Sequence, residues 1–135
     1  MQWLIHGRLT GAVAEALRRL GHITHTPQEL LEDDAGGKAA APLDWLELLA
    51  AAQKRQWDVL TNDEALVGAV FAKRFAFNRV LVYLQLAGGE VEQDDAIDRL
   101  FQRYKRLSPR RLYTVTARRV KVRQLPRGRA PRAGA

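Results

Sequence analysis

Two acidic residues stand where carboxylates could bind a metal ion. Asp44 opens a helical pattern of apolar residues, and Asp63 comes just after the predicted strand at residues 57–60. Two carboxylates and bound waters can hold Mg²⁺, with substrate phosphates completing the coordination. Such an ion can activate a water and stabilise the leaving oxygen in phosphodiester cleavage. Asp44 and Asp63 are therefore candidate metal ligands.

Helix capping explains the same two positions without any chemistry. Residues 61–64 (TNDE) have the pattern of a capping box, in which Thr61 accepts from a first-turn amide and Glu64 reaches back. Acidic residues in a first helical turn also suit the helix dipole, and Asp44 with Glu47 has the same pattern. The spacing alone leaves a metal site and a pair of capped helices both open.

The sequence lacks the residues of several other chemistries. It has no cysteine, its only serine is Ser108, and no glycine-rich phosphate-binding motif follows a strand. His22 and His25 fall on one predicted strand at a spacing that puts them on opposite faces, so a shared metal is not expected. Covalent catalysis by serine or cysteine is excluded, and nucleotide binding through those motifs is unsupported.

The elements that would position these residues alternate between strands and helices. Strands are predicted at 3–5, 22–26, 57–60 and 79–84, and helices at 9–20, from 44, at 61–71 and at 94–107. Residues 27–43 show little periodicity, with Pro27 ending a strand and a loop at 33–37. Residues 112–116 and 120–125 predict a final hairpin. This order predicts an α/β fold with a mostly parallel central sheet covered by helices on both faces.

The position of each candidate follows from that fold. In open α/β sheets, ligands bind outside the carboxyl ends of the strands, near the point where the strand order reverses. The residues just after each predicted strand are His6, the stretch after Thr26, residues 62–64 and Gln85. Asp44 and Asp63 are expected to point toward this same edge of the sheet.

The positive charge is concentrated at the C-terminus. The chain carries 22 Lys and Arg against 15 Asp and Glu, a net charge of +7. Residues 118–135 contain seven basic residues and no acid, so residues 1–117 are neutral. Such a segment could follow a phosphate backbone, or it could be a solvated tail. The candidate nucleic-acid contacts are Arg118, Arg119, Lys121, Arg123 and Arg127.

Length and composition predict one soluble domain. The 135 residues fit a single domain at 1–125, followed by a basic tail at 126–135 that we expect to be disordered. No apolar run approaches the roughly 18 residues of a membrane span, and the N-terminus is too short in apolar residues for a signal peptide. We therefore expect a cytoplasmic protein with no membrane partner.

Several stretches together resemble the PIN-like nuclease domains, in particular the small bacterial type related to VapC-like toxins. They are residues 4–9 (LIHGRL), 13–22 (VAEALRRLGH), Asp44 with 48–50 (LLA), and 58–63 (DVLTND). The likeness covers roughly residues 2–85. It implies a three-layer α/β/α fold and an Mg²⁺- or Mn²⁺-dependent endoribonuclease with carboxylates clustered at the carboxyl edge. It also implies RNA as a partner, and an antitoxin protein or a homodimer.

The resemblance carries over to particular residues, with two departures. Asp44 and Asp63 match family acids, but His6 stands where the first acid is expected, and Ala65 follows Glu64 where a further acid often occurs. Glu64 is a candidate partial substitute for that acid, and His6 is a candidate general base or phosphate contact. A neutral imidazole is a poor ligand for Mg²⁺. Three possibilities therefore stay open: a metal-dependent ribonuclease, a catalytically degenerate module that binds RNA or a protein, and another function on the same fold class.

Overall fold

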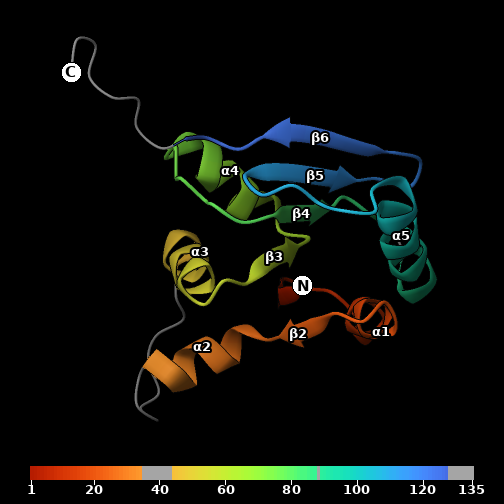
Figure 1. The fold of residues 1–135 in the computed structure, drawn as a ribbon, viewed down its shortest axis with the longest axis horizontal. Helices are drawn as coiled ribbons and strands as arrows, with labels where there is room; N and C mark the ends of the chain where they lie inside the picture. The colour runs from red at the N-terminus through yellow and green to blue at the C-terminus, as the bar shows by residue number, and fades with distance from the viewer. Residues whose placement is uncertain (35–43, 88, 128–135) are drawn as a thin grey trace.

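A computed structural model describes residues 1–34, 44–87 and 89–127. Six strands form one sheet in the order β2-β1-β3-β4-β5-β6 (Figure 1). All neighbouring strands are parallel except β5 and β6, which are antiparallel. The elements are β1 (Gln2–His6), α1 (Gly11–Arg19), β2 (Ile23–His25), α2 (Pro27–Asp34), α3 (Trp45–Lys54), β3 (Asp58–Thr61), α4 (Glu64–Ala72), β4 (Leu81–Leu84), α5 (Glu90–Arg103), β5 (Arg111–Val115) and β6 (Val120–Gln124).

Helices cover both faces of the sheet. On one face α1 and α5 pack over a core that includes Trp3 and Val82, and on the other face residues of α2, α3 and α4 pack over a core that includes Leu4 and Val59. Successive strand residues such as Trp3 and Leu4 enter different cores because side chains alternate across a strand. The predicted α/β fold with a mostly parallel sheet and two helical layers is confirmed.

Local sequence signals fix the ends of several helices. Asp44 caps α3, since its Oδ1 accepts a hydrogen bond of 2.8 Å from Glu47 N. Gly21 ends the turn after α1 with a φ of 88°, as the sequence predicts for a left-handed cap. A hydrogen bond from Trp45 Nε1 to Asp63 Oδ2 joins the starts of α3 and α4 at the carboxyl edge of the sheet.

The interpretation of residues 27–43 as lacking regular structure is wrong for its first part. Residues 27–34 form α2. Pro27 begins this helix instead of only ending a strand, because proline fits a first helical position, where its missing N–H is not needed. Glu29 reaches back to accept from Thr26 N at 2.6 Å, the second half of a capping box.

The C-terminal hairpin lies where the sequence predicts it. β6 pairs with β5 from Arg111↔Gln124 to Val115↔Val120 and forms one edge of the sheet. Leu125 is buried, and Leu125 N donates to Arg110 O at 2.9 Å, which holds the end of the hairpin. Of the predicted tail, residues 128–135 lie outside the described residues. No helix in the described part of the chain has the length and apolar character needed to cross a membrane.

Candidate functional site

The strand order creates a switch point between β1 and β3. From β1 the chain passes to β2 on one side, and β3 pairs with β1 on the other side. The carboxyl ends of β1 and β3 meet there, with His6 opposite Thr61 in the register. A cleft of about 360 Å³ opens at this point, lined by Gly7, Arg8, Asn62, Asp63 and Glu64. The predicted edge is therefore a real concavity, at the position where α/β sheets bind ligands.

Asn62 joins the two loops that form this cleft. Its Oδ1 accepts from Arg8 N at 2.9 Å, and its Nδ2 donates to Arg8 O at 3.0 Å. Gly7 takes a φ of 101°, and a Cβ at this position would collide with Asn62 Oδ1. The loop after β1 is thus held against the loop after β3 by one side-chain amide and one glycine.

Asp63 caps α4 and also contacts α3. Its Oδ1 accepts from Ala65 N at 2.9 Å, and its Oδ2 accepts from Trp45 Nε1 at 3.2 Å. The predicted capping box is wrong in its cap residue. Thr61 belongs to β3, and its hydroxyl accepts from Asp63 N at 3.0 Å instead of capping the helix. Asp63 therefore holds the starts of α3 and α4 together at the cleft.

His6 is linked to Asp63 through Thr61. His6 Nδ1 lies 2.8 Å from Thr61 Oγ1, the same hydroxyl that accepts from Asp63 N. Burial lowers the pKa of His6, and the opposing charge of Asp63 does not offset this effect. His6 is thus held as a neutral imidazole near neutral pH. Two of the predicted site residues, His6 and Asp63, are brought together by the fold.

The other two acids occupy the rim of the same region. Asp44 caps α3 next to Trp45, the residue that contacts Asp63. Glu64 is exposed in the first turn of α4 and lines the cleft. No group of three or more His, Asp or Glu residues in the described ranges is arranged to hold a metal ion. Any Mg²⁺ ion here would therefore depend on one or two carboxylates with bound waters, and not on a cluster of three protein ligands.

A second and larger cavity begins at Glu64 and extends to the edge of the sheet. It has a volume of about 640 Å³ and lies between α4 and strands β4, β5 and β6; we call it the edge groove. Tyr83, Thr114 and Lys121 face one another across three strands in a single row of the register. Arg123 reaches from β6 to α4, with its guanidinium 3.9 Å from the ring centre of Phe71. Glu64 is the only acid among the described residues that line it.

Electrostatics also connect this groove with the cleft. Burial raises the pKa of Tyr83, and the negative charges of Glu64 and then Asp63 raise it further. These two acids therefore lie close enough to act on a residue of the groove floor. Because Glu64 lines both cavities, the cleft and the edge groove meet at this residue.

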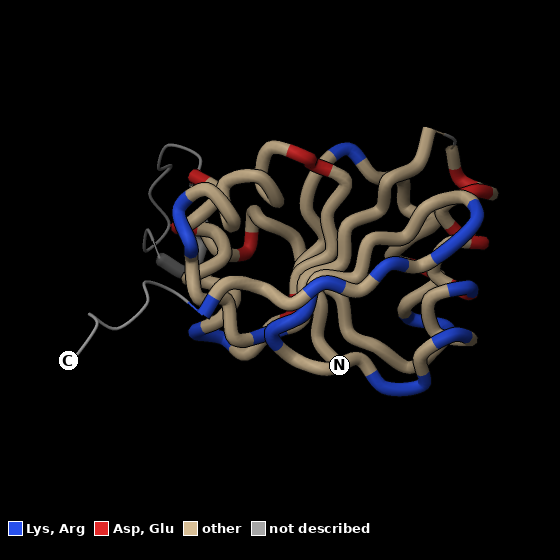
Figure 2. Tube along the Cα trace, turned by 90° about the horizontal axis from the view of Figure 1, so that it is seen from above, with Lys and Arg blue, Asp and Glu red and all other residues tan. Residues whose placement is uncertain are grey.

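The predicted nucleic-acid contacts line three different cavities along the hairpin. Lys121 and Arg123 line the edge groove, whereas Arg118 and Arg119 line a cavity with Arg99 and Arg103 of α5. Arg127 lines a third with Arg110. Figure 2 shows a line of Lys and Arg positions running along β6, with more at α5. The basic hairpin is therefore part of the folded domain and not only a tail.

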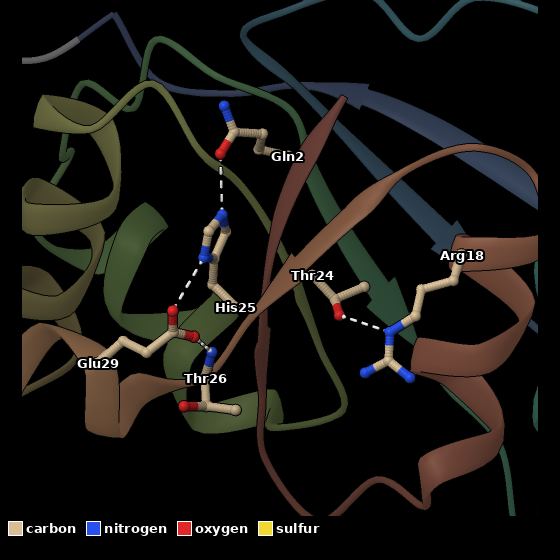
Figure 3. Close-up of polar contacts among 6 residues, drawn as sticks. All are labelled: Gln2, Arg18, Thr24, His25, Thr26 and Glu29. Atoms are coloured by element: carbon tan, nitrogen blue, oxygen red, sulfur yellow. Dashed lines mark hydrogen bonds and ion pairs between the residues drawn. The ribbon is translucent and has the colours of Figure 1, made fainter.

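The other two histidines lie away from the cleft, on different sides of the sheet. His22 Nδ1 accepts from Trp3 Nε1 at 3.3 Å and its ring faces Phe101. His25 stacks on Trp57 with ring centres 3.7 Å apart. Figure 3 shows His25 between Gln2 and Glu29, at distances of 2.9 and 3.1 Å. The expectation that His22 and His25 do not share a metal agrees with these separate environments.

The roles of several residues at the site could not be predicted from the sequence. Asn62, Trp45 and Tyr83 gain their roles from partners that are distant in sequence, such as Arg8, which is 54 residues from Asn62. Arg99 and Arg103 belong to a helix that carries five acids, so the net charge of this segment is negative and does not indicate a basic site. The absence of acids after Asp98 is the sequence feature that could have indicated a basic surface including these two arginines.

Comparisons with known proteins add no family to this geometry. A scan against protein-family models, a search of curated proteins and a search of solved structures each returned no match. The function is therefore argued from the cleft, the edge groove and the basic hairpin.

Proposed function

We propose that this chain is a PIN-like domain that binds single-stranded RNA, with the phosphate backbone lying along the edge groove. The observation that carries this proposal is the groove itself. It meets the switch-point cleft at Glu64, and Lys121 and Arg123 line it. The sequence resemblance to PIN-like domains and the sheet order with His6 and Asp63 at the carboxyl edge support the PIN-like part of the proposal.

The groove offers the two kinds of contact that single strands need. Lys121 and Arg123 supply charge for phosphates, and the half-buried ring of Tyr83 supplies an aromatic surface on the floor. Proteins that bind single strands combine a positive groove with aromatic side chains on which bases stack. Such contacts do not depend on base identity, so we expect weak sequence preference.

The proposal is tested by removing the two groove cations. We expect Lys121→Gln with Arg123→Gln to weaken binding to a single-stranded RNA oligonucleotide at all sequences alike. If each cation contacts one phosphate, the slope of log K against log salt falls by about 1.4 in magnitude. The matched control is Arg18→Gln with Lys54→Gln, which removes two exposed cations from α1 and α3 and should leave the slope unchanged. Equal slopes in wild type and the groove variant would contradict the proposal.

A second candidate is a metal-dependent endoribonuclease, which the link from His6 through Thr61 to Asp63 favours. No group of three His, Asp or Glu residues in the described ranges is arranged to hold a metal ion, and no metal-dependent step is assigned to this candidate. The test is RNA cleavage with Mg²⁺, Mn²⁺ or chelator. A weakened nuclease gains activity in His6→Asp and loses it in Asp63→Asn. The same background cleavage in all three proteins rules this candidate out.

The setting of this function is also a proposal. The absence of cysteine agrees with a reducing compartment, and the cytoplasm is where RNA would be met. An antitoxin protein or a second copy of the chain stays a predicted partner. Neither is needed for the RNA-binding experiment, which measures the isolated domain.

A further inference from the structure

Four arginines surround one cavity on the side of β6 away from the edge groove. The cavity has a volume of about 250 Å³ and is lined by Arg99 and Arg103 of α5, by Arg118 and Arg119 of the β5–β6 turn, and by Val120. Val120 packs against the core of the α1 and α5 face, whereas the edge groove lies against α4. The two cavities are therefore separate.

The turn that carries two of these arginines is held by a threonine. Thr116 Oγ1 accepts from Arg118 N at 3.3 Å and from Arg119 N at 3.1 Å. Thr116 N donates to Arg119 O at 2.9 Å, which closes the turn. The backbone at Arg118 and Arg119 is thus fixed before any ligand arrives, and this lowers the entropy cost of binding.

The helix side of the cavity is fixed as well. Arg99 Nη1 donates to Thr116 O at 2.8 Å, so this guanidinium is tied to the turn. A guanidinium carries five N–H donors, and those of Arg99 beyond Nη1 make no hydrogen bond to the described residues. Helix α5 and the hairpin turn therefore present one joined basic wall.

No acid whose side chain the structure describes forms an ion pair with any of the four arginines. Ion pairs between described side chains include Arg19 with Asp94, His25 with Glu29 and Arg79 with Asp58. Residues 99–135 contain no Asp or Glu at all. Like charges gathered at one cavity repel one another, and an anion in the cavity would relieve this repulsion.

Helix electrostatics explain only part of this arrangement. Arg103 lies in the last turn of α5, where a positive charge is favoured by the helix dipole. That effect gives no reason for Arg118 and Arg119 to face the same cavity from a hairpin turn. Guanidinium groups are the side chains best suited to phosphate oxygens, which they bind with paired N–H donors.

We propose that this cavity, the arginine pocket, is a binding site for a phosphate group. The ligand is a dianionic phosphate, either free, as inorganic phosphate or a nucleotide, or at the 5′ end of an RNA strand. The arginine pocket does not rest on the RNA-binding function proposed for the edge groove, because the two cavities share no lining residue.

The first experiment titrates inorganic phosphate into the full chain and follows binding by calorimetry and by thermal unfolding, with chloride at the same ionic strength as reference. We expect phosphate to bind and to raise the unfolding temperature. In Arg103→Gln with Arg118→Gln the affinity falls about tenfold or more, since two charge-assisted hydrogen bonds are lost. Arg18→Gln with Lys54→Gln is the control and keeps the wild-type affinity. Absence of phosphate binding, or equal loss in both variants, overturns the proposal.

The second experiment identifies the source of the phosphate. RNA oligonucleotides with a 5′-phosphate or a 5′-hydroxyl are compared on wild type and on the arginine-pocket variant. A preference for the 5′-phosphate that the variant loses assigns the pocket to RNA ends. Equal binding of both oligonucleotides, with inorganic phosphate still bound more tightly by wild type than by the arginine-pocket variant, assigns it to free phosphate. The edge-groove variant Lys121→Gln with Arg123→Gln keeps phosphate binding in either case, which separates this test from that of the proposed function.

Discussion

Asp63 is the residue on which the cleft depends most, because both of its carboxylate oxygens are used. One accepts from Ala65 N at the start of α4 and the other from Trp45 Nε1 of α3. We expect Asp63→Asn to keep most of the stability, since asparagine caps as well as aspartate. Asp63→Ala removes the cap and should lower the free energy of unfolding by about 1 kcal/mol. Urea unfolding of the two variants measures this difference, and equal stability of both would contradict a capping role.

His6 predicts a pH dependence with a definite sign. Because burial lowers its pKa below the ordinary 6.5, the unfolded chain binds the His6 proton more readily than the folded one. The His6 contribution to stability is therefore fully present above pH 6.5 and is lost as the pH falls from there through the lower pKa of the folded state. Urea unfolding between pH 8 and pH 5 should show a steeper loss in wild type than in His6→Gln.

Two controls belong to the His6 experiment. The pKa of His22 is also lowered, first by burial, so only the difference between wild type and His6→Gln reports on His6. In Asp63→Asn the opposing charge is gone, and an NMR titration should give a still lower pKa for His6. Identical pH profiles in wild type and His6→Gln would show that His6 titrates alike in the folded and unfolded chains.

At this scale the sequence predicts positions better than contacts. His6 and Asp63 could be assigned to one edge because each comes at or just after a strand end, and parallel strands end together. The role of Thr61 could not be predicted, because residues 61–64 (TNDE) fit a capping box and also fit the end of a strand. Which residue caps the helix depends on where β3 stops, and pairing with β1 and β4 decides that.

Among the elements, the loop after β1 is the one most sharply constrained. Gly7 has a φ of 101° and sits against Asn62, so Gly7→Ala introduces both a strained backbone and a collision. We expect a loss of about 1–3 kcal/mol in the free energy of unfolding. Gly68→Ala in α4, where nothing lies within 4 Å, is the control and should be neutral or stabilising.

A double-mutant cycle separates the two causes at Gly7. Asn62→Ala removes the atoms that collide with the new Cβ but leaves the backbone strain. Gly7→Ala should therefore cost less in the Asn62→Ala background than in wild type, with a coupling of roughly 0.5–3 kcal/mol. A coupling of zero would assign the whole effect to the backbone and would remove Asn62 from the account of this loop.

The start of helix α2 could be predicted from the sequence, but the rest of the helix could not. Thr26, Pro27 and Glu29 carry a recognisable start signal, but the weak apolar periodicity that follows hides the helix. Its capping depends on Glu29, drawn in Figure 3 with His25 and Thr26. The helix was recoverable from its cap, whereas the stacking of His25 on Trp57 needs the assembled sheet.

The cap of α2 predicts a second pH effect, in the acid range. Burial alone would raise the pKa of Glu29, but the bonds from Thr26 N and His25 outweigh it, so the pKa lies below the ordinary 4.5. The Glu29 contribution is present above pH 4.5 and is lost as the pH falls through the folded value. Glu29→Gln should therefore flatten acid unfolding, measured by circular dichroism. Glu15→Gln, an exposed acid on α1, should change the acid midpoint less.

At the scale of the whole molecule, charge is segregated by sequence and by surface. Residues 99–135 contain 13 Lys and Arg and no Asp or Glu, and the preceding residues carry all 15 acids. The strand order puts β5 and β6 at one edge with α5 beside them, so this excess becomes a basic edge (Figure 2). A field of one sign along an edge attracts a polyanion and raises its association rate. The sequence predicts the excess charge, and only the sheet order shows where it lies.

The location of the charge, rather than its amount, is what the RNA-binding proposal requires. Ending the chain after Arg127 removes Arg129 and Arg132, and Lys121→Gln with Arg123→Gln also removes two cations. The two changes are equal in charge, and the second removes cations that line the edge groove. We expect the groove variant to lower RNA affinity and to reduce the salt slope by about 1.4, with a smaller effect from the truncation. A larger effect from the truncation would show that the residues after Arg127, and not the edge groove, carry most of the RNA binding. Fluorescence anisotropy at several salt concentrations measures the affinity and the salt slope of both proteins.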